Sequence, residues 1–423
     1  MFKNKEVRRM KKVSLTLTGL FVFATAYGAA YKIPEQSTRS MGTSGAYFAG
    51  ANSADAAYFN PAGMVWIEDK DKTLIELGAK YILLPKINFY GIARDPVNIN
   101  PAPPITGAKT SKEEFIVPYF HFILPAGERT RFGFSFVTPF GLSKRWSADY
   151  QRGTAEEFTL KTFEFDTTVA YQVDDRLSLG AGIRALYSTG QIKYRREPIY
   201  RINMNGESGI YFGYLLSAAL KLSDNLRVAT IYRSEIKPEI NGTAQGYMLL
   251  PGPTVYPIST EGNVKVILPA EWRLGLSYDY SENTTVDLTY EITFWGRYNK
   301  LDINFEDPVA ESNLGIPKPK NWHDSKTIRL GLIHKFNQKF TGMLGIAYDE
   351  TPIPQSTLGF ELPDANGWIF SVGSLWNPKP NLELGVAYLY VKKFDRTVNN
   401  ANMNGDFSDM KAHLFNVSLG YKF

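Results

Sequence analysis

Residues 284–295, TTVDLTYEITFW, alternate between two kinds of side chain along their length. On an extended chain one face carries Val286, Leu288, Tyr290, Ile292 and Phe294, and the other carries Asp287, Thr289, Glu291 and Thr293. Such a period of two is typical of a β-strand with one apolar face and one polar face. The same alternation runs through 176–187, 271–280 and 413–423. The sequence therefore predicts an all-β structure from about residue 72 onward.

The length of these strands indicates a membrane barrel. Half-buried strands of a soluble sandwich or barrel would alternate in the same way, but soluble strands average about 5–6 residues, and the patterns here run for ten or more. Their polar face carries Gly, Ser and charges of both signs, as a wet lumen would, and aromatic residues gather near strand ends, as in interfacial girdles. These features favour a transmembrane barrel.

The links between the predicted strands alternate in length. Short polar links are expected at 128–130, 173–176, 223–225, 281–283, 336–339 and 377–381. Longer connections are expected at 84–112, 142–154, 195–208, 241–260, 304–325, 350–366 and 394–410. Tight periplasmic turns and long external loops are typical of an outer-membrane barrel. Residues 72–423 are therefore predicted to form an antiparallel barrel of about 14 strands.

Residues 1–30 read as a secretory signal peptide, with a basic start, an apolar run and small residues between Ala26 and Ala30. They hold six of the 47 Lys and Arg and one of the 42 Asp and Glu, which leaves 41 of each and no net charge in the rest of the chain. That balance argues against nucleic-acid binding. The chain has no cysteine, which excludes disulfides and thiolate metal sites.

Residues 31–71 do not alternate and are rich in Gly, Ala and Ser. They cannot add a membrane strand, because an odd strand would spoil the even number that bacterial barrels require. They could instead lie outside the barrel, be disordered or fill its lumen. Several aromatic anchors favour a plug, or hatch, inside the lumen. Within it, Asn60 can hydrogen-bond local backbone, Pro61 stiffens the chain, and Ala62 permits close approach to the wall.

Several short motifs follow one another along the chain in a specific order and spacing. They are SMGTSGAYFAGANSADAAYFNPAGM (40–64), YRSEIK (232–237), LPAEW (268–272), YDETPIPQ (348–355), LPD (362–364), Trp368 and the terminal aromatic strand. This set resembles the FadL/TodX family of outer-membrane transporters. The resemblance implies a 14-stranded barrel with an N-terminal hatch in a Gram-negative outer membrane. It also implies capture of fatty acids or aromatic hydrocarbons at external loops, binding in an apolar lumen pocket and lateral release into membrane lipid.

The resemblance further implies a kinked third strand that opens the barrel wall. The third strand here is RFGFSFVTPFGL (131–142). Pro139 cannot donate a ladder hydrogen bond and Gly141 tolerates unusual dihedrals, so together they are predicted to border the lateral gap. The alternative is that both residues simply end the strand before the next loop.

In a fatty-acid transporter of this family, basic residues meet the ligand carboxylate. The positions that correspond here are Lys318 and Arg195. The alternative is that both are solvated loop charges. Tyr247, Met248, Leu249 and Leu250 are predicted to form a hydrophobic capture loop, the alternative being packing against a neighbouring loop.

The remaining expectations concern partners and rival functions. The terminal aromatic residue, Phe423, is predicted to be read by the outer-membrane assembly machinery, and the transporter is predicted to act as a monomer beside lipid. No cofactor or metal is predicted. An enzyme is disfavoured because there is no G-x-S-x-G and none of the four histidines has metal-ligand spacing. A passive porin would show stable conductance, which a plugged barrel would not.

Overall fold

The computed structural model describes residues 30–68, 70–93, 105–252 and 254–423. The predicted signal peptide therefore lies outside the described residues, apart from Ala30. The strands of the barrel wall, several in two segments, are β1 (Leu74–Leu84), β4 (Glu113–Pro125), β5 (Thr130–Val137) with β6 (Gly141–Arg145), β7 (Glu157–Gln172), β8 (Leu177–Arg196), β10 (Tyr211–Lys221) with β9 (Tyr200–Ser208), β11 (Leu226–Arg233) with β12 (Glu239–Leu250), β14 (Glu271–Ser281) with β13 (Thr254–Lys265), β15 (Thr284–Thr293) with β17 (Ile303–Phe305), β19 (Ser325–Lys335), β20 (Phe340–Asp349), β21 (Gly367–Lys379), β22 (Leu382–Lys393) and β25 (Lys411–Lys422).

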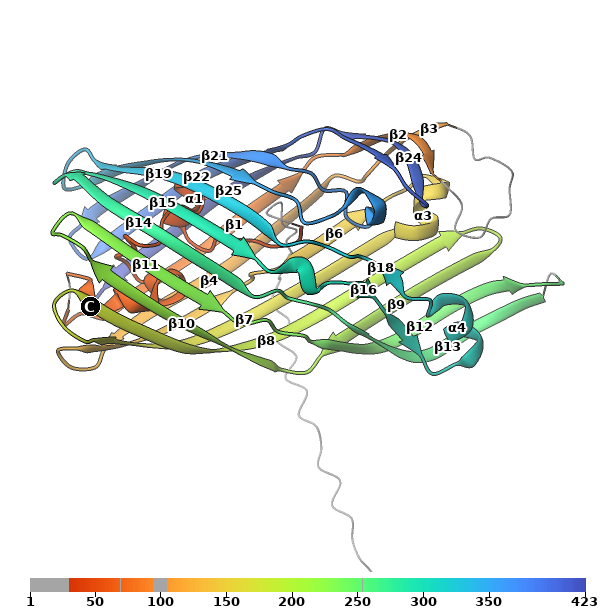
Figure 1. Cartoon of the computed structure of the whole chain (residues 1–423), viewed down its shortest axis with the longest axis horizontal. Helices are drawn as coiled ribbons and strands as arrows, with labels where there is room; N and C mark the ends of the chain where they lie inside the picture. The colour runs from red at the N-terminus through yellow and green to blue at the C-terminus, as the bar shows by residue number, and fades with distance from the viewer. Residues whose placement is uncertain (1–29, 69, 94–104, 253) are drawn as a thin grey trace, which may run out of the picture.

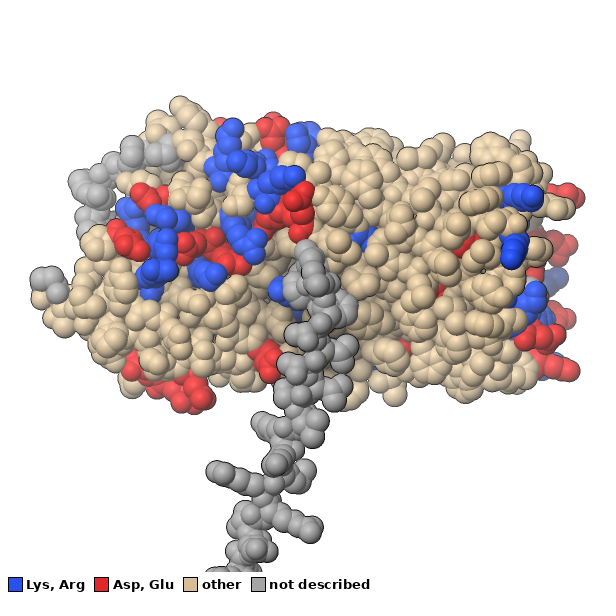
Figure 2. Space-filling model, turned by 180° about the vertical axis from the view of Figure 1, so that it is seen from behind, with Lys and Arg blue, Asp and Glu red and all other residues tan. Residues whose placement is uncertain are grey.

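These strands form a closed antiparallel barrel of 14 strands, as predicted (Figure 1). The first and last strands close it, because β1 pairs with β25 from Leu74↔Lys422 to Leu83↔His413. Apolar side chains such as Ile183 and Val417 are more than half exposed on the outer face. Figure 2 shows a broad belt of uncharged surface between charged ends. No helix among the described residues has the length and apolar character needed to cross a bilayer.

The two ends of the barrel differ. All six predicted short links join neighbouring strands at the end where the chain terminates (Figure 1). The opposite end carries the longer connections, which contain β2 (Asn88–Ala93), β3 (Thr106–Lys109), β16 (Lys300–Leu301), β18 (Lys318–Pro319), β23 (Arg396–Asn399), β24 (Met403–Ser408), α3 (Asp149–Ala155), α4 (Pro308–Leu314), η2 (Trp295–Arg297) and η3 (Gln355–Thr357). The short-turn end is periplasmic and the other end is external.

Two connections predicted as loops consist largely of strands of the barrel wall. Residues 195–208 contain the end of β8 and all of β9, and residues 241–260 contain most of β12 and β13. The reason is that β12 continues the wall beyond the membrane by pairing with β9 and β13. Both segments were predicted as long connections, but their backbone groups are paired within the sheet.

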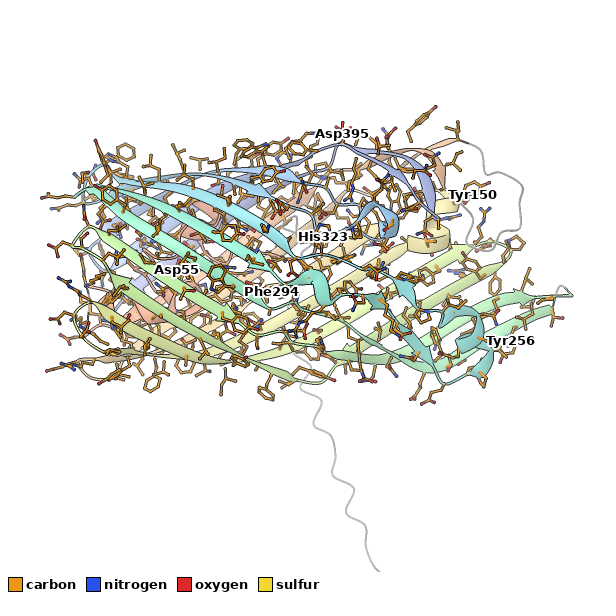
Figure 3. All side chains as sticks on the ribbon, in the orientation of Figure 1. Asp55, Tyr150, Tyr256, Phe294, His323 and Asp395 are labelled. Atoms are coloured by element: carbon orange, nitrogen blue, oxygen red, sulfur yellow. The ribbon has the colours of Figure 1, made fainter. Side chains whose placement is uncertain are left out.

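The N-terminal segment fills the lumen, as predicted for a hatch. It contains α1 (Thr38–Gly42), α2 (Ala56–Phe59) and η1 (Pro61–Trp66), which lie inside the barrel in Figure 1. Asp55, labelled in Figure 3, precedes α2 and is fully buried. Helix α1 packs against β20, β21, β22 and β25, whereas η1 packs against β5, β7, β8 and β10. The hatch thus contacts the wall on several sides.

The Asn60-Pro61-Ala62 motif begins η1. The Asn60 side chain accepts a hydrogen bond from Gly63 N (3.2 Å), and Pro61 occupies the first turn, where a missing N–H costs nothing. Ala62 N donates to Ser217 Oγ (3.0 Å), and Ala62 O accepts from Ser178 Oγ (2.7 Å). A Cβ on Gly180 of the wall would lie 2.7 Å from Ala62 N, so only glycine permits this approach. The motif therefore docks the hatch backbone directly onto β8 and β10.

Candidate functional site

A cavity lies in the external half of the lumen; the space between its lining atoms is about 980 Å³, which includes space open to solvent. Its strand residues include Leu160, Ile192, Met204, Ile240, Ala244 and Val264, and its loop residues include Tyr298, Leu301, Phe305, Trp322 and Leu362. Inward positions of β7, β8, β9, β12 and β13 supply the apolar wall because side chains alternate along each strand. An apolar lining with a few polar groups is typical of a site that binds a hydrophobic small molecule.

One ion pair interrupts the apolar lining. Lys320 and Glu361 both line the cavity and form a salt bridge. Burial raises the pKa of the Glu361 carboxyl, but the Lys320 ammonium outweighs burial, so the pKa ends below its ordinary value. Glu361 is therefore ionised at neutral pH, and the pair is electrically neutral. A ligand carboxylate at Lys320 would have to share this ammonium with Glu361.

Lys318 and Arg195, the cations predicted to meet a ligand carboxylate, do not line the cavity. Lys318 is exposed, and its Nζ lies 2.9 Å from Tyr194 Oη and 4.4 Å from the centre of the Tyr194 ring. Arg195 Nε lies 3.4 Å from Glu156 Oε1 and 3.6 Å from Glu197 Oε1. The structure thus places Lys320 on the cavity and these two cations outside it. Their role toward a carboxylate stays a prediction.

The barrel wall is interrupted between the second and third strands. The ladder between β4 and β5 runs from Pro125↔Arg131 to Phe120↔Phe136 and stops there. Beyond Pro139, β6 pairs with β7 from Gly141↔Lys161 to Arg145↔Glu157. Among the described residues no ladder joins β6 to β4. The chain thus leaves β4 at residues 138–140, where Pro139 and Gly141 were predicted to lie beside a gap.

The hatch supplies the backbone partners that β4 does not. Gly141 N donates to Tyr31 O (2.9 Å), and Ile33 N donates to Pro139 O (2.7 Å). Lys32 and Phe140 are therefore opposite each other in a short antiparallel bridge. Tyr31 and Leu142 also line the cavity. The break in the wall and the cavity are thus contiguous, with residues 30–33 between them.

The predicted capture loop is part of the β12–β13 hairpin, and the expectation of an exposed loop is wrong. Met248 is 5% exposed and packs with the cavity residues, while Tyr247, Leu249 and Leu250 are partly buried. Alternation along β12 turns Ala244 and Met248 inward, which removes them from solvent. Tyr256 of β13 lies near the external tip of the molecule in Figure 3. A capture role for this hairpin stays a prediction.

The described residues contain no group of three or more His, Cys, Asp or Glu side chains that could hold a metal ion. The polar groups near the cavity are an ion pair, amides and hydroxyls. The arrangement suits binding and passage of an apolar molecule.

A family model described as outer membrane protein transport protein (OMPP1/FadL/TodX) matches residues 19–423. The chain belongs to this family. Among curated relatives, the long-chain fatty acid transport protein of Salmonella typhi is 23% identical over 97% of this chain and 98% of its own length. Outer membrane protein P1 of Haemophilus influenzae is 22% identical over 98% of this chain and 100% of its own.

Solved structures give the same fold. A Pseudomonas aeruginosa FadL homologue superimposes with a TM-score of 0.81 at 19% identity, covering 93% of this chain and 99% of that structure. The Pseudomonas putida toluene transporter TodX gives a TM-score of 0.67 at 15% identity, covering 94% and 98%. This OMPP1/FadL/TodX member is therefore an outer-membrane barrel of a Gram-negative bacterium, in a family of transporters of hydrophobic compounds and not of enzymes.

Two features of the site were missed from the sequence. Lys318 was preferred over Lys320, which stands only two residues further along the chain, and the spacing of the two lysines does not tell which one lies on the cavity. Glu361 comes from a loop 41 residues away, and no sequence pattern joins the two. The pairing of residues 30–33 with the strand break is likewise a tertiary contact without a local signal.

Proposed function

We propose that the protein takes up long-chain fatty acids. The ligand enters from the external end, occupies the apolar cavity and leaves sideways into the bilayer through the break between β4 and β6. Hydrophobic molecules partition out of water, so a route that ends in lipid suits them better than an aqueous channel.

The observation that carries this proposal is the contiguity of cavity and break. Leu142 lines the cavity and directly follows Gly141, which begins the segment that does not pair with β4. Tyr31 lines the cavity and pairs with Gly141. A ligand in the cavity therefore lies one side chain from the interrupted wall.

The second support is the single cation on the cavity lining. Of the cavity-lining residues that the structure describes, only Lys320 carries a basic side chain. In an apolar surrounding a charged hydrogen bond from its ammonium fixes the orientation of a carboxylate. We place the ligand carboxylate there. Lys318 and Arg195 remain candidates for guiding the carboxylate before it enters.

An aromatic hydrocarbon is the second candidate ligand. The Lys320 charge is offset by Glu361, and the rest of the lining is mainly apolar, so an uncharged molecule would meet no unpaired charge. A less specific porin is the third candidate. It predicts steady conductance in planar bilayers, whereas a lumen filled by residues 30–67 predicts almost none.

Native mass spectrometry of the detergent-purified protein tests the proposal. Palmitate, a linear alkane and toluene are offered together to the wild type and to Lys320→Met and Lys318→Met. Binding of palmitate that weakens in Lys320→Met but not in Lys318→Met supports the proposal, provided alkane and toluene binding stay unchanged. Equal loss of all three ligands would refute the carboxylate role, and binding of toluene alone would favour the second candidate.

A further inference from the structure

A network of buried charges lies in the lumen next to the cavity residue Tyr31. We define the charged layer as Lys32, Glu164, Asp166, Arg184, Arg233, Glu271, Arg273, Glu291 and Arg329. Each is at most 5% exposed. Apart from Lys32, these side chains come from β7, β8, β11, β14, β15 and β19 and point into the lumen. Burial of so many charges is rare unless they are paired.

One half of the charged layer is centred on two carboxylates. Lys32 Nζ lies 3.0 Å from Glu271 Oε2 and 2.8 Å from Glu291 Oε1. Arg273 bridges the same two residues, at 3.2 Å from Glu271 and 2.6 Å from Glu291. Because Lys32 directly follows the cavity residue Tyr31, this half borders the cavity from below.

The other half of the charged layer is held by two arginines. Arg184 Nη2 lies 2.7 Å from Glu164 Oε2, and Arg233 Nη2 lies 2.6 Å from Asp166 Oδ2. Arg233 also contacts Glu164, which joins the two pairs into one network. The Arg233 guanidinium stacks on the ring of Tyr58 in the hatch, 4.3 Å from its centre.

The charged layer separates two apolar regions. Above it lies the cluster that contains the cavity residues, and below it lies a second cluster of the hatch and the periplasmic half of the wall, which includes Phe48, Phe59 and Met64. An apolar ligand in the cavity would therefore find an apolar region further down the lumen. It would reach that region only by separating buried ion pairs.

We propose that the charged layer is the floor of the cavity and makes release lateral. Breaking a buried ion pair is strongly unfavourable because it leaves charges without compensation, whereas the break beside Phe140 and Leu142 presents apolar side chains. On this view the direction of release is set by the nine charged residues, and the bulk of the hatch is secondary. The inference rests on the proposed function for its route and extends it to the residues that determine the route.

Two double substitutions remove parts of the floor while leaving intact pairs. Arg233→Met with Asp166→Leu leaves the Arg184–Glu164 pair, and Arg273→Met with Glu271→Leu leaves the Lys32–Glu291 pair. Each removes one positive and one negative charge, so net charge is unchanged. Replacing paired buried charges by apolar residues of similar volume is often tolerated.

A matched control removes an ion pair from the same strands outside the floor. Arg227 of β11 and Asp279 of β14 pair at 2.9 Å and line the periplasmic mouth of the lumen. Arg227→Met with Asp279→Leu thus changes a pair on β11 and β14 without touching the charged layer.

Photo-crosslinking in lipid vesicles tests the proposal. Wild type, both double variants, their fourfold combination and the control are loaded with a diazirine-labelled fatty acid and, separately, with a diazirine-labelled alkane, and labelled peptides are identified by mass spectrometry. In the wild type and the control, label is expected on peptides containing Leu142 and Val266 and to be scarce on those containing Phe59 and Met64. In the fourfold variant, hatch label should rise about tenfold, with smaller rises in each double variant.

Equal labelling of the hatch peptides and the cavity peptides in the wild type would overturn the proposal. An unchanged labelling pattern in the fourfold variant would overturn it as well. If the fourfold variant fails to fold, the double variants decide by the same criterion. The alkane arm separates this inference from the fatty-acid assignment. Alkane label that follows the expected pattern while the fatty acid fails to bind would uphold the floor and refute the ligand.

Discussion

Two seams of the same barrel are built very differently. Between β20 and β21, ten consecutive residue pairs run from Phe340↔Trp376 to Asp349↔Gly367. Between β4 and the third strand, pairing stops at Phe120↔Phe136. Behind the continuous seam the hatch packs tightly, with Ser44 Oγ 2.9 Å from Ser371 Oγ. Behind the interrupted seam lies the short arm of residues 30–33, and beyond it the cavity.

The difference shows how a barrel can be open without leaving polar backbone to lipid. Unpaired backbone groups are costly in a membrane. At the break, Gly141 N and Pro139 O are paired with the hatch arm, and Pro139 itself has no N–H to satisfy. At the break, backbone hydrogen bonds are therefore made with the hatch in the lumen, whereas in the continuous seam they are made between neighbouring strands.

A proline in the continuous seam should have the largest effect on stability. Val372 pairs with Leu344 in the middle of the β20–β21 ladder. Val372→Pro removes a ladder hydrogen bond inside a strand that is paired on both sides, so it should lower stability more than any other change proposed below. Pro139→Val, in the interrupted seam, should change stability by less than about 1 kcal/mol. Thermal unfolding of both variants in detergent checks this, and similar losses would show that the two seams are equally rigid.

The next largest effect on stability is expected from replacing a wall glycine that the hatch contacts, compared with a wall glycine that borders the cavity. A Cβ on Gly345 would lie 2.1 Å from the backbone carbon of Thr43, so Gly345→Ala forces the hatch away from β20. Overpacking of this kind costs about 1–3 kcal/mol. Gly190 borders the cavity, and the atom nearest to a Cβ added there would be Ile240 Cδ1, at 3.3 Å. If Gly190→Ala lowers the unfolding temperature as much as Gly345→Ala, the tight packing is not confined to the sealed side.

Lys320→Met should alter ligand preference more than stability. Loss of one charged hydrogen bond, partly offset by Glu361, should weaken palmitate binding about tenfold. Lys318→Met, on an exposed side chain, should leave binding unchanged. Isothermal titration calorimetry with palmitate provides the comparison. A tenfold loss in both variants would indicate a general electrostatic effect.

Lowering the pH should change stability least, through protonation of Glu361. The Glu361 pKa is lowered in the folded protein because the Lys320 ammonium favours the carboxylate. The resulting stabilisation is complete above the unfolded pKa of about 4.3 and is lost as pH falls through the lower folded value. The loop that carries Glu361 also packs Phe360 on Trp146, 5.3 Å between ring centres. Tryptophan fluorescence should therefore change below about pH 4 in the wild type and not in Glu361→Gln.

The sequence predicted the barrel well because its signals are local. Alternation identifies strands such as 284–293, polar stretches of three to five residues identify the six short turns, and Pro139 marks a place where a ladder cannot continue. Residues 241–260 were misassigned because external strands lack the apolar face that the membrane imposes on the others. Lys320 and Glu361 could not be paired in advance, because their contact depends on how two external loops fold over the cavity.

A reversible cross-link at the break tests lateral release most directly. Lys32 and Phe140 form a non-hydrogen-bonded antiparallel pair, whose Cα atoms lie about 4.5 Å apart, within the range for a disulfide. The chain has no other cysteine. In Lys32→Cys with Phe140→Cys, oxidation should lock the arm over the break and lower cellular uptake of labelled palmitate at least about tenfold relative to the reduced form of the same variant, and reductant should restore it. Both forms lack the Lys32 ammonium, so the comparison isolates the cross-link. In Phe120→Cys with Phe136→Cys, which lies in the paired part of the same seam, oxidation should leave palmitate uptake unchanged. Uptake that continues unchanged through the locked break would contradict lateral release.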